Sequence, residues 1–297
     1  MIQVEELWKR FGRFNAVRGL SMTVPEGSAF ALVGANGAGK TTTIKTIMNI
    51  VEPNRGQVRV MGVDSRRLRA PQYAQIGYVS ENQEMPARLT VGQFLAYLRP
   101  FYPTWDETLE AAILGQAQLP RERRIGELSH GMRAKLALTC ALSFRPRLLV
   151  LDEPFSGLDP LVRDEFMEVL LAQGGDTTLL ISSHELGEIE GVATHVGFID
   201  QGQLLFQEPM DDLIARVREV HVTLEGDVDL PPGLPPEWLN VQAAGSVVSF
   251  VDTCFNEPEL RSKIPAVLGA VRRIDIRPVD LRAIFTTIAR SIKKEAA

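Results

Sequence analysis

The sequence is poor in the residues that usually build disulfide frameworks and metal centres. It has only two cysteines, Cys140 and Cys254, and four histidines among 297 residues. Neither cysteine belongs to a CxxC pair, so we expect both to be structural rather than metal-binding or redox-active. Long apolar runs are also missing, because no stretch reaches the roughly 18 to 20 residues that span a bilayer. Any role at a membrane is therefore expected to depend on a partner.

An excess of basic residues is absent as well. The chain has 32 lysine and arginine residues against 37 aspartate and glutamate residues, which gives a formal charge of −5. Overall charge thus gives no reason for direct binding to nucleic acid or to an anionic membrane, and we predict no nucleic-acid partner. The polar start of the sequence lacks the apolar core of a signal peptide, so a cytoplasmic protein is expected.

Enough apolar sequence is present for a sizeable core, since 45% of the residues are hydrophobic. Short β-type runs alternate with helical stretches up to about Gln207, which predicts an α/β domain with a mostly parallel sheet over residues 1–207. The alternating strand pattern of "REVHVTL" (Arg218 to Leu224) follows, and then a final helix from about Asp280. This later part predicts a small C-terminal α+β domain over residues 211–297.

The stretch "LVGANGAGKTTT" (Leu32 to Thr43) is typical of a phosphate-binding loop. It fits G-x-x-x-x-G-K-[ST], follows an apolar strand and opens a helical segment. Loop amides and the helix N-terminus would attract phosphate, Lys40 would reach the outer phosphates, and Thr41 could ligate Mg²⁺. The alternative is a plain glycine-rich turn, which would leave the Lys-Thr pair without a role. The residues expected to surround the nucleotide here are Gly34, Asn36, Gly37, Ala38, Gly39, Lys40, Thr41 and Thr42.

A second motif, "RLLVLDEP", places two adjacent carboxylates at the end of an apolar strand. Successive side chains of a strand point to opposite faces. Asp152 can therefore face the Mg²⁺ shell, while Glu153 can polarise the water that attacks a γ-phosphate. By itself, such a strand would more often run into an exposed turn. Together with the phosphate loop, it favours a site that hydrolyses a nucleotide.

Three further motifs complete an ordered set: "LSHGM" (Leu128 to Met132), "SGLDP" (Ser156 to Pro160) and "SSHE" (Ser182 to Glu185). This set resembles the nucleotide-binding subunits of ABC transporters over residues 1 to about 207. The resemblance implies a P-loop NTPase fold of the ABC ATPase type with a helical signature subdomain at about 82–145. It also implies ATP and Mg²⁺ as cofactors, and a head-to-tail dimer with two ATP molecules between the phosphate loop of one subunit and "LSHGM" of the other.

The resemblance also assigns roles to single residues. Ser129 and Gly131 would contact the ATP held by the second subunit, and Phe11 would stack on adenine. His184 would contact the γ-phosphate and orient the attacking water, and Asp159 would link the two sites across the dimer. Structural alternatives stay open, because Ser129 could be only an N-cap and Phe11 only a packed core residue. Likewise, His184 could be an ordinary loop residue and Asp159 an ordinary turn residue.

Three positions depart from the family pattern. The family usually has glycine where His130 stands, and glutamine where Met132 and Glu81 stand. His130 adds a titratable side chain near a γ-phosphate. Glu81 can still ligate Mg²⁺ through oxygen but adds negative charge beside the nucleotide, and Gln83 is a nearby alternative. These variants resemble a bacterial branch whose ATPases work with separately encoded exporter permeases.

The resemblance implies that ATP binding closes the dimer and that hydrolysis reopens it, with the motion passed to an integral membrane permease. The second ATPase subunit is either another copy of this chain or a related chain. We therefore expect a location on the inner face of the cell membrane, held there through the permease. The C-terminal domain resembles small domains found on some exporter ATPases, and packing, dimer support or regulation are its expected roles.

The segment from Glu81 to Trp105 resembles the part of the helical subdomain that contacts the permease. Tyr97, Phe101, Tyr102 and Trp105 look exposed there, and aromatic residues are favoured at interfaces. The alternative is that they form the subdomain's own small core.

A local signal follows in "TWDE". Thr104 and Glu107 predict a capping box that starts a helix running through about Gln118. This prediction concerns structure only.

Other functions remain open at this stage. One is an ABC ATPase without a permease, such as an iron-sulfur assembly ATPase. Another is a different P-loop class, such as a GTPase or a small-molecule kinase, but no NKxD stretch is present and "LSHGM" would be unexplained. A third is a module that binds ATP without hydrolysing it, which the intact Lys40, Asp152, Glu153 and His184 argue against.

Overall fold

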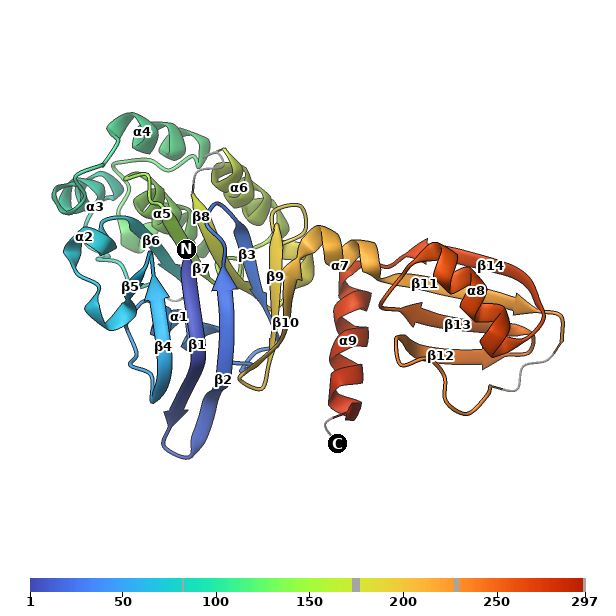
Figure 1. Ribbon diagram of the computed structural model, residues 1–297. Coiled ribbons are helices and arrows are strands. Elements are labelled where there is room, and N and C mark those ends of the chain that lie inside the picture. The colour runs from blue at the N-terminus through green and yellow to red at the C-terminus, as the bar shows by residue number, and fades with distance from the viewer. Residues whose placement is uncertain (82, 173–176, 227–229, 296–297) are drawn as a thin grey trace. The chain divides into compact units, whose positions relative to one another are not determined.

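The computed structural model describes residues 1–81, 83–172, 177–226 and 230–295 (Figure 1). The chain divides into two compact units, Met1–Gln207 and Glu208–Ala297. The expected domains at 1–207 and 211–297 both contain residues outside the described ranges. The expected helical subdomain begins at one of them, residue 82.

The first unit is built on two sheets. Its strands are β1 (Ile2–Phe11), β2 (Phe14–Val24), β3 (Ala29–Val33), β4 (Arg55–Val60), β5 (Val63–Asp64), β6 (Ile76–Ser80), β7 (Leu148–Asp152), β8 (Thr178–Ser183), β9 (His195–Asp200) and β10 (Gln203–Pro209), the last of which crosses the boundary. One sheet has the order β10-β9-β3-β8-β7-β6, and the pairs β9-β3, β3-β8, β8-β7 and β7-β6 in it are parallel. The other is antiparallel, with the order β2-β1-β4-β5.

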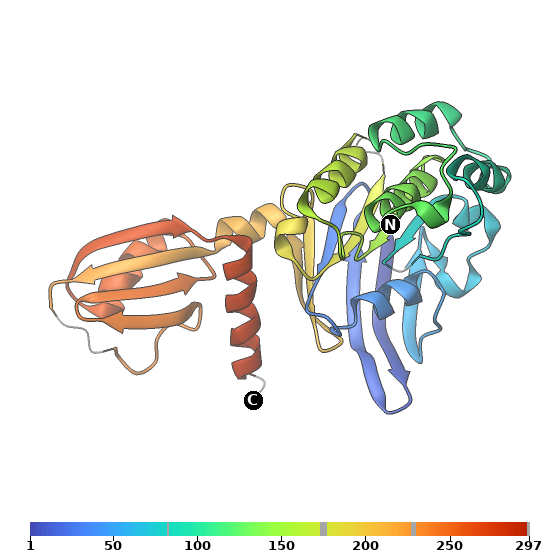
Figure 2. The same ribbon diagram turned by 180° about the vertical axis from the view of Figure 1, so that it is seen from behind.

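Helices cover and cap these sheets. They are α1 (Lys40–Ile47), η1 (Ser65–Arg67), α2 (Ala70–Tyr73), α3 (Val91–Leu98), η2 (Arg99–Phe101), α4 (Glu107–Gln116), η3 (Ile125–Glu127), α5 (His130–Leu142), α6 (Pro160–Leu171) and η4 (Leu186–Glu188). Opposite views show α3, α4 and α5 gathered at one end of the sheets (Figures 1 and 2). The α/β fold class predicted from the alternation of strands and helices is confirmed.

The parallel strands bring the site motifs to one edge of the sheet. Strand β7 reads LLVLD and is buried at every position, as expected for a strand covered on both faces. Its neighbours β3 and β8 run the same way, so the loops after all three strands leave from the same edge. Ligand sites of open α/β sheets form at such carboxyl edges.

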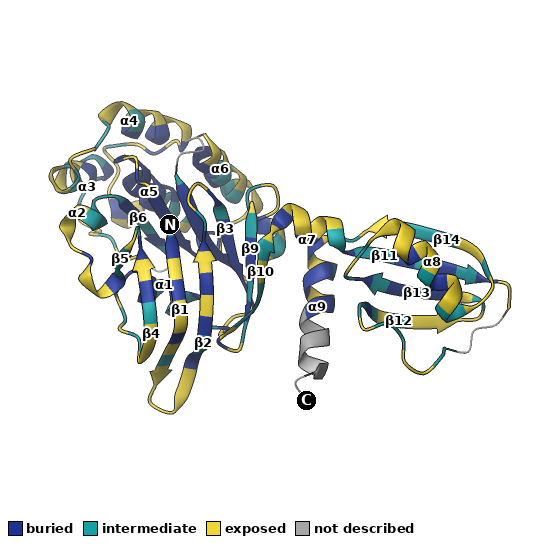
Figure 3. Cartoon of the chain, viewed as in Figure 1, coloured by how far each residue is buried: buried dark blue, intermediate teal, exposed yellow. Residues whose placement is uncertain are grey.

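The main core lies between the two sheets and includes one face of α1. Leu20 of the antiparallel sheet, Ile44 of α1 and Val150 of the parallel sheet are all fully buried and belong to a single apolar cluster. The central strands β7 and β8 are buried at every position, whereas α4 is largely exposed on its outer side (Figure 3). Full burial of each such aliphatic side chain contributes roughly 1.5 to 3 kcal/mol, which fixes the sheet that carries the site.

The helical subdomain has a separate small core. Leu95 of α3, Leu114 of α4 and Leu136 of α5 are buried in it. Below this core, the buried carboxylate of Glu110 accepts hydrogen bonds from Arg99 (3.0 Å) and from the Trp105 indole (2.8 Å). The group is fully paired, as a buried charge requires.

One local prediction for this subdomain needs correction. Helix α4 is capped by Asp106, whose side chain accepts from the Leu109 amide at 2.9 Å, so the capping box at Thr104 is wrong. The Thr104 hydroxyl instead donates to the Phe144 carbonyl at 2.6 Å, because the chain enters the helix two residues later than the pattern suggests.

The four aromatic residues of this region also divide into two kinds. Tyr97 and Phe101 are 60% and 61% exposed and contact each other edge to face at 5.6 Å. Tyr102 stacks on Phe144 with ring centroids 4.0 Å apart, and Trp105 packs on the subdomain core. Tyr97 and Phe101 are therefore the more exposed pair.

The second unit is α+β. It contains α7 (Met210–Arg216), β11 (Arg218–Leu224), β12 (Trp238–Ala244), β13 (Val247–Asp252), α8 (Glu257–Leu268), β14 (Val271–Pro278) and α9 (Leu281–Glu295). Its sheet is antiparallel with the order β12-β13-β11-β14. Val220, Val222 and Leu224 point to one face of β11 and are buried, which follows the period-two pattern of the sequence. Across the described part of the chain, no helix has both the length and the apolar character to cross a bilayer.

Candidate functional site

The loop between β3 and α1 is shaped by its glycines. A Cβ atom at Gly34 would lie 2.2 Å from the Ile199 carbonyl oxygen, so only glycine fits against β9. Gly39, the N-cap of α1, has φ of 109°, and a Cβ there would lie 2.6 Å from the Ala16 carbonyl oxygen. The tight path of the loop therefore depends on glycine at both positions.

Lys40, the first residue of α1, links this loop to the end of β7. Its side chain is only 4% exposed, and its Nζ donates to the carbonyls of Gly34 (2.5 Å) and Ala35 (3.1 Å). The same Nζ lies 3.0 Å from Glu153 Oε1. The loop, the lysine and the carboxylate thus form one cluster at the sheet edge.

Asp152 ends β7 and is buried beside α1. Its Oδ1 accepts hydrogen bonds from the hydroxyls of Thr41 (3.1 Å) and Ser182 (2.8 Å). Burial raises the pKa of this carboxyl, and the two hydrogen bonds oppose that shift. Hard oxygen donors of this kind suit Mg²⁺, so Thr41 and Asp152 fit a metal that also binds phosphate oxygens. The described residues contain no cluster of three or more histidine, cysteine or acidic side chains that could hold a metal without a nucleotide.

Glu153 follows Asp152 with an unusual backbone. Its φ is 50°, in the left-handed region, and its amide donates to the Ser182 hydroxyl at 2.9 Å. A non-glycine residue in this conformation costs of order 1 to 3 kcal/mol and is typical of active sites. The conformation turns the Glu153 side chain away from the strand direction and toward Lys40 and His184.

His184 comes directly after β8 and completes the cluster. Its Nδ1 donates to Glu153 Oε2 at 2.7 Å, and this hydrogen bond raises the pKa of the imidazole. The turn that carries it is fixed by Ser183, whose hydroxyl accepts from the Glu185 amide (2.9 Å) and donates to the Glu188 carboxylate. Both carboxylate oxygens of Glu153 are therefore in contact with a basic side chain.

A cavity of about 390 Å³ opens beside these groups. Pockets that bind small molecules commonly have volumes of roughly 300 to 1,000 Å³, so this cavity is large enough for such a ligand. Its lining residues are Phe14, Ala16, Asn36, Gly37, Gly39, Lys40, Thr41, Thr42, Glu81, Glu153, Ser156 and His184.

Several of the expected nucleotide-binding and metal-binding residues lie outside this lining. Asp152 lies behind Thr41, bonded to its hydroxyl, and Gly34 and Ala38 shape the loop from beneath rather than face the cavity. Phe11 is also outside, whereas Phe14 lines the cavity; the two are paired across the β1-β2 hairpin. Phe11 lies instead under Lys9, with Nζ 4.9 Å from the ring centroid.

Ser129 and Asp159 each cap the start of a helix. The Ser129 hydroxyl accepts from the Met132 amide at 3.2 Å at the start of α5, and Asp159 accepts from the Val162 amide at 3.1 Å at the start of α6. A Cβ atom on Gly131 would lie 2.7 Å from Val162 Cγ1, so the two helix starts lie against each other. These three residues are not part of the cavity lining.

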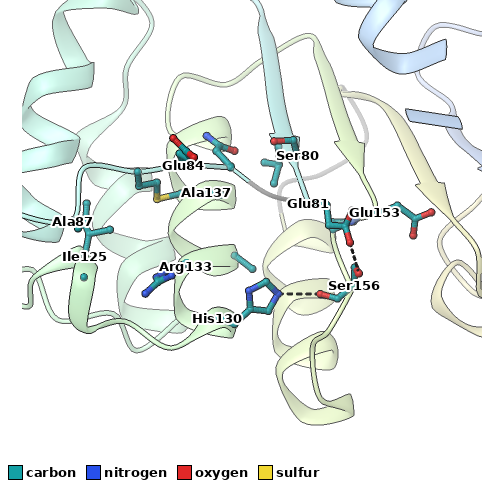
Figure 4. Close-up of a pocket in the computed structure, with 16 residues that line it drawn as sticks. Ser80, Glu81, Glu84, Ala87, Ile125, His130, Arg133, Ala137, Glu153 and Ser156 are labelled. Carbon is teal, nitrogen blue, oxygen red and sulfur yellow. Dashed lines mark hydrogen bonds between the residues drawn. The ribbon is translucent and has the colours of Figure 1, made fainter. Parts of the chain in front are cut away.

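Two of the departures from the family pattern contact one serine. Figure 4 shows His130 directed at Ser156, and Ser156 directed at Glu81. His130 Nε2 lies 3.0 Å from the Ser156 carbonyl oxygen, and the Ser156 hydroxyl donates to Glu81 Oε1 at 2.7 Å.

Sequence reasoning missed Phe14, Ser156 and Ser182 as site residues. Ser182 bonds to both Asp152 and Glu153, whereas the "SSHE" motif by itself indicates only its histidine. Parallel pairing of Asp152 with Ser182 across β7 and β8 is the signal that could have identified it.

Comparison with known proteins identifies the family. The ABC transporter family matches residues 17–156. The bacitracin transport ATP-binding protein BcrA of Bacillus licheniformis is 34% identical over 226 residues, which cover 74% of this chain and 73% of that protein. This chain belongs to the ABC transporter ATP-binding proteins.

Two other ABC proteins agree with this assignment. The ABC transporter ATP-binding protein YtrB of Bacillus subtilis is 29% identical over 233 residues, covering 77% of this chain and 79% of that protein. A solved structure of an ATP-binding subunit of an ABC transporter superposes with a TM-score of 0.66 at 27% identity, covering 72% of this chain and 92% of the other.

The resemblance inferred from the motifs is thus confirmed. So are the ABC ATPase core and the assignment as an ATP-hydrolysing subunit of an ABC transporter. ATP is the nucleotide that this ABC protein binds.

Proposed function

We propose that this ABC ATPase powers export through a separate membrane permease, and that Lys40, Glu153 and His184 are its catalytic residues. The observation that carries the proposal is their convergence. Two basic side chains contact the two carboxylate oxygens of Glu153, at 3.0 and 2.7 Å, beside a cavity lined by the phosphate loop. On this proposal the protein lies on the cytoplasmic face of the cell membrane, bound there to its permease.

Each catalytic group has a separate task in the proposal. Loop amides and Lys40 bind the phosphates, with Asn36, Gly37 and Thr42 around them. Glu153 accepts a proton from the attacking water, and His184 orients that water and the γ-phosphate. Thr41, Asp152 and Glu81 would hold Mg²⁺, which when bound neutralises charge on the phosphates.

The contact between Lys40 and Glu153 suggests an order of events. Lys40 Nζ pairs with Glu153 Oε1 at 3.0 Å, so the lysine engages one carboxylate oxygen of the proposed base. A triphosphate in the loop offers Lys40 a stronger anionic partner. Binding of ATP would thus draw Lys40 from Glu153 and leave that carboxylate to His184 and water.

A second ATPase subunit, another copy or a related chain, completes the site in this proposal. Ser129, Gly131 and Asp159 lie outside the cavity of their own chain, at the paired starts of α5 and α6. Helix N-termini attract anions, so this pair of ends suits the γ-phosphate of the other subunit.

The permease would bind at a groove beside the helical subdomain. This groove of about 590 Å³ is lined partly by Glu84, Arg133 and Ala137 (Figure 4). The exposed pair Tyr97 and Phe101 lies in the same subdomain, and aromatic residues are enriched at protein interfaces. We retain residues 1–207 as the ATPase domain and 211–297 as an accessory domain without catalytic residues.

The first test is hydrolysis by Glu153→Gln. We expect kcat to fall by about a hundredfold or more while ATP still binds, because the amide cannot accept the proton. The nearby Glu185→Gln, whose backbone and not its side chain contacts Ser183, is the matched control. Hydrolysis by Glu153→Gln at the wild-type rate would remove Glu153 from its proposed role.

The second test concerns the partner. Tagged Glu153→Gln protein is captured from detergent-solubilised membranes of its host with Mg-ATP, and the captured proteins are identified. Recovery of a polytopic membrane protein supports the transporter and names the permease. Recovery of soluble partners alone, with the bait absent from membranes, would instead favour an ABC ATPase that works without a permease.

A further inference from the structure

The nucleotide cavity and the groove of about 590 Å³ beside the helical subdomain have one wall in common. Glu81, Glu153 and Ser156 line both hollows, whereas the other lining residues belong to one or the other. Glu153 is the proposed base, so any shift of this wall changes the position of the reacting group. What holds the wall in place therefore bears directly on hydrolysis.

Ser156 is the centre of that wall. Its amide donates to the Glu153 carbonyl at 3.2 Å, and its hydroxyl donates to Glu81 Oε1 at 2.7 Å. It thus joins the end of β7 to the segment that follows β6. Its own carbonyl is the remaining polar group, and it accepts from His130.

His130 reaches this carbonyl from the first position of α5. A carbonyl oxygen only accepts hydrogen bonds, so the Nε2 that lies 3.0 Å away must carry the proton. The imidazole also lies next to Gly157, where a Cβ atom would be 3.6 Å from Nε2. At this position the family pattern has glycine, which has no side chain to make such a contact.

The contact joins the first residue of α5 to the loop that follows Glu153. Lys135 of α5 forms an ion pair with Glu165 of α6, and Gly131 packs against Val162. Both of these contacts connect α5 to α6. Among the hydrogen bonds of the described residues, that of His130 connects the signature helix to the loop between Glu153 and Asp159 itself.

We propose that His130 is a positioning residue for ATP hydrolysis, which fixes Ser156 and so the wall that carries Glu153 and Glu81. The bridge runs from α5 through His130, Ser156 and Glu81 (Figure 4). It acts within one chain and needs no permease. The inference depends on ATP hydrolysis by this subunit and is independent of the proposed export.

The test compares two replacements in the purified full-length protein without permease. The amide nitrogen of His130→Gln can occupy the place of Nε2 and donate to the same carbonyl, whereas His130→Leu fills similar space without a donor. We expect His130→Leu to lower kcat by about five- to tenfold, the typical effect of one hydrogen bond, with little change in KM for ATP. His130→Gln should stay within about twofold of wild type.

Two further variants sharpen the comparison. His195→Leu, at a histidine whose ring contacts the hydroxyl of its neighbour Thr194 at 3.0 Å and is not part of the cavity lining, is the matched control and should hydrolyse ATP as the wild type does. Ser156→Ala keeps the carbonyl but removes the bond to Glu81. If the bridge is one unit, the loss in His130→Leu with Ser156→Ala should be smaller than the product of the two single losses.

A spectroscopic measurement keeps the proposal testable if a variant fails to fold. With only four histidines, ¹⁵N labelling of the ring nitrogens resolves His130. We expect the tautomer that carries its proton at Nε2, and we expect that proton to exchange slowly because the Ser156 carbonyl accepts it.

Three results would overturn the proposal. One is the Nδ1-protonated tautomer or rapid exchange at His130. Another is equal activity of His130→Gln and His130→Leu. The third is a rise in KM for ATP at unchanged kcat in His130→Leu, which would mean that His130 binds nucleotide, as a contact to the second subunit's phosphate would, and does not position Glu153.

Discussion

Glu153 shows at the scale of one residue how the site stores strain for function. Its left-handed backbone, with φ of 50°, is unfavourable for a residue with a Cβ atom. It persists because the amide is bonded to Ser182 and both carboxylate oxygens have basic partners. The base is therefore held in one direction before any substrate enters.

The aromatic residue at the nucleotide cavity gives a first prediction. Phe14 lines the cavity and Phe11 does not, so Phe14→Ala should weaken ATP binding about three- to tenfold, as expected for loss of one aromatic contact. Phe11→Ala, its partner across the hairpin, should change the Kd by less than about twofold. Equilibrium titration with a fluorescent ATP analogue measures both. A larger effect at Phe11 would restore the stacking role that the motif assigns to it.

The hydrogen bond between His184 and Glu153 gives a second prediction, in pH. The hydrogen bond to Glu153 raises the pKa of the His184 imidazole above its ordinary 6.5. The contribution of this pair to the free energy of unfolding is therefore fully present below pH 6.5. This contribution is lost as pH rises through the higher folded pKa. NMR titration should therefore place the His184 pKa above 6.5 in the wild type and lower in Glu153→Gln. A pKa at or below 6.5 in the wild type would contradict the geometry.

At the scale of elements, α5 and α6 act as a pair. Their starts carry Ser129 and Asp159, their first turns pack at Gly131 and Val162, and Lys135 pairs with Glu165 further along. Two helix N-termini are thus kept at a fixed spacing, which two separate caps could not achieve.

This packing predicts the effect of a methyl group at Gly131. Gly131→Ala would place a Cβ 2.7 Å from Val162 Cγ1, so it should lower the free energy of unfolding by about 1 to 3 kcal/mol, as overpacking does. Adding Val162→Ala should recover most of the loss, because the clashing methyls are removed. Urea unfolding of the wild type, both single variants and the double variant measures this. Full stability of Gly131→Ala would show that glycine serves only a ligand contact there.

At the scale of the whole molecule, the arrangement predicts ATP-dependent association. The residues of the cavity and the paired starts of α5 and α6 are separate in one chain, so a second chain can bring them together. Glu153→Gln, which should hold ATP, is expected to reach about twice the 32.9 kDa of one chain in Mg-ATP. Light scattering after gel filtration measures the mass, and the double variant with Lys40→Ala should stay at one chain. A constant monomer mass at saturating ATP would argue for a related chain as partner.

The sequence alone determined the family and the fold class, and it indicated four residues that the structure brings together at the candidate site. Lys40, Asp152, Glu153 and His184 could be found because each stands at the end of a short apolar strand or the start of a helix, and parallel strands bring such ends to one edge. The apolar strands and the helix starts are local patterns that the order of residues shows directly. The shared edge follows from them, because strands that alternate with helices form a parallel sheet.

Only the tertiary structure decided which neighbours support these residues. Phe14 rather than Phe11 lines the cavity, because the hairpin pairs them and only one of the two side chains faces the phosphate loop. Ser156 joins Glu81, Glu153 and His130, and the first of these lies 75 positions before it in the chain. Contacts of this range depend on how the strands and helices pack, and no periodicity in the sequence records them.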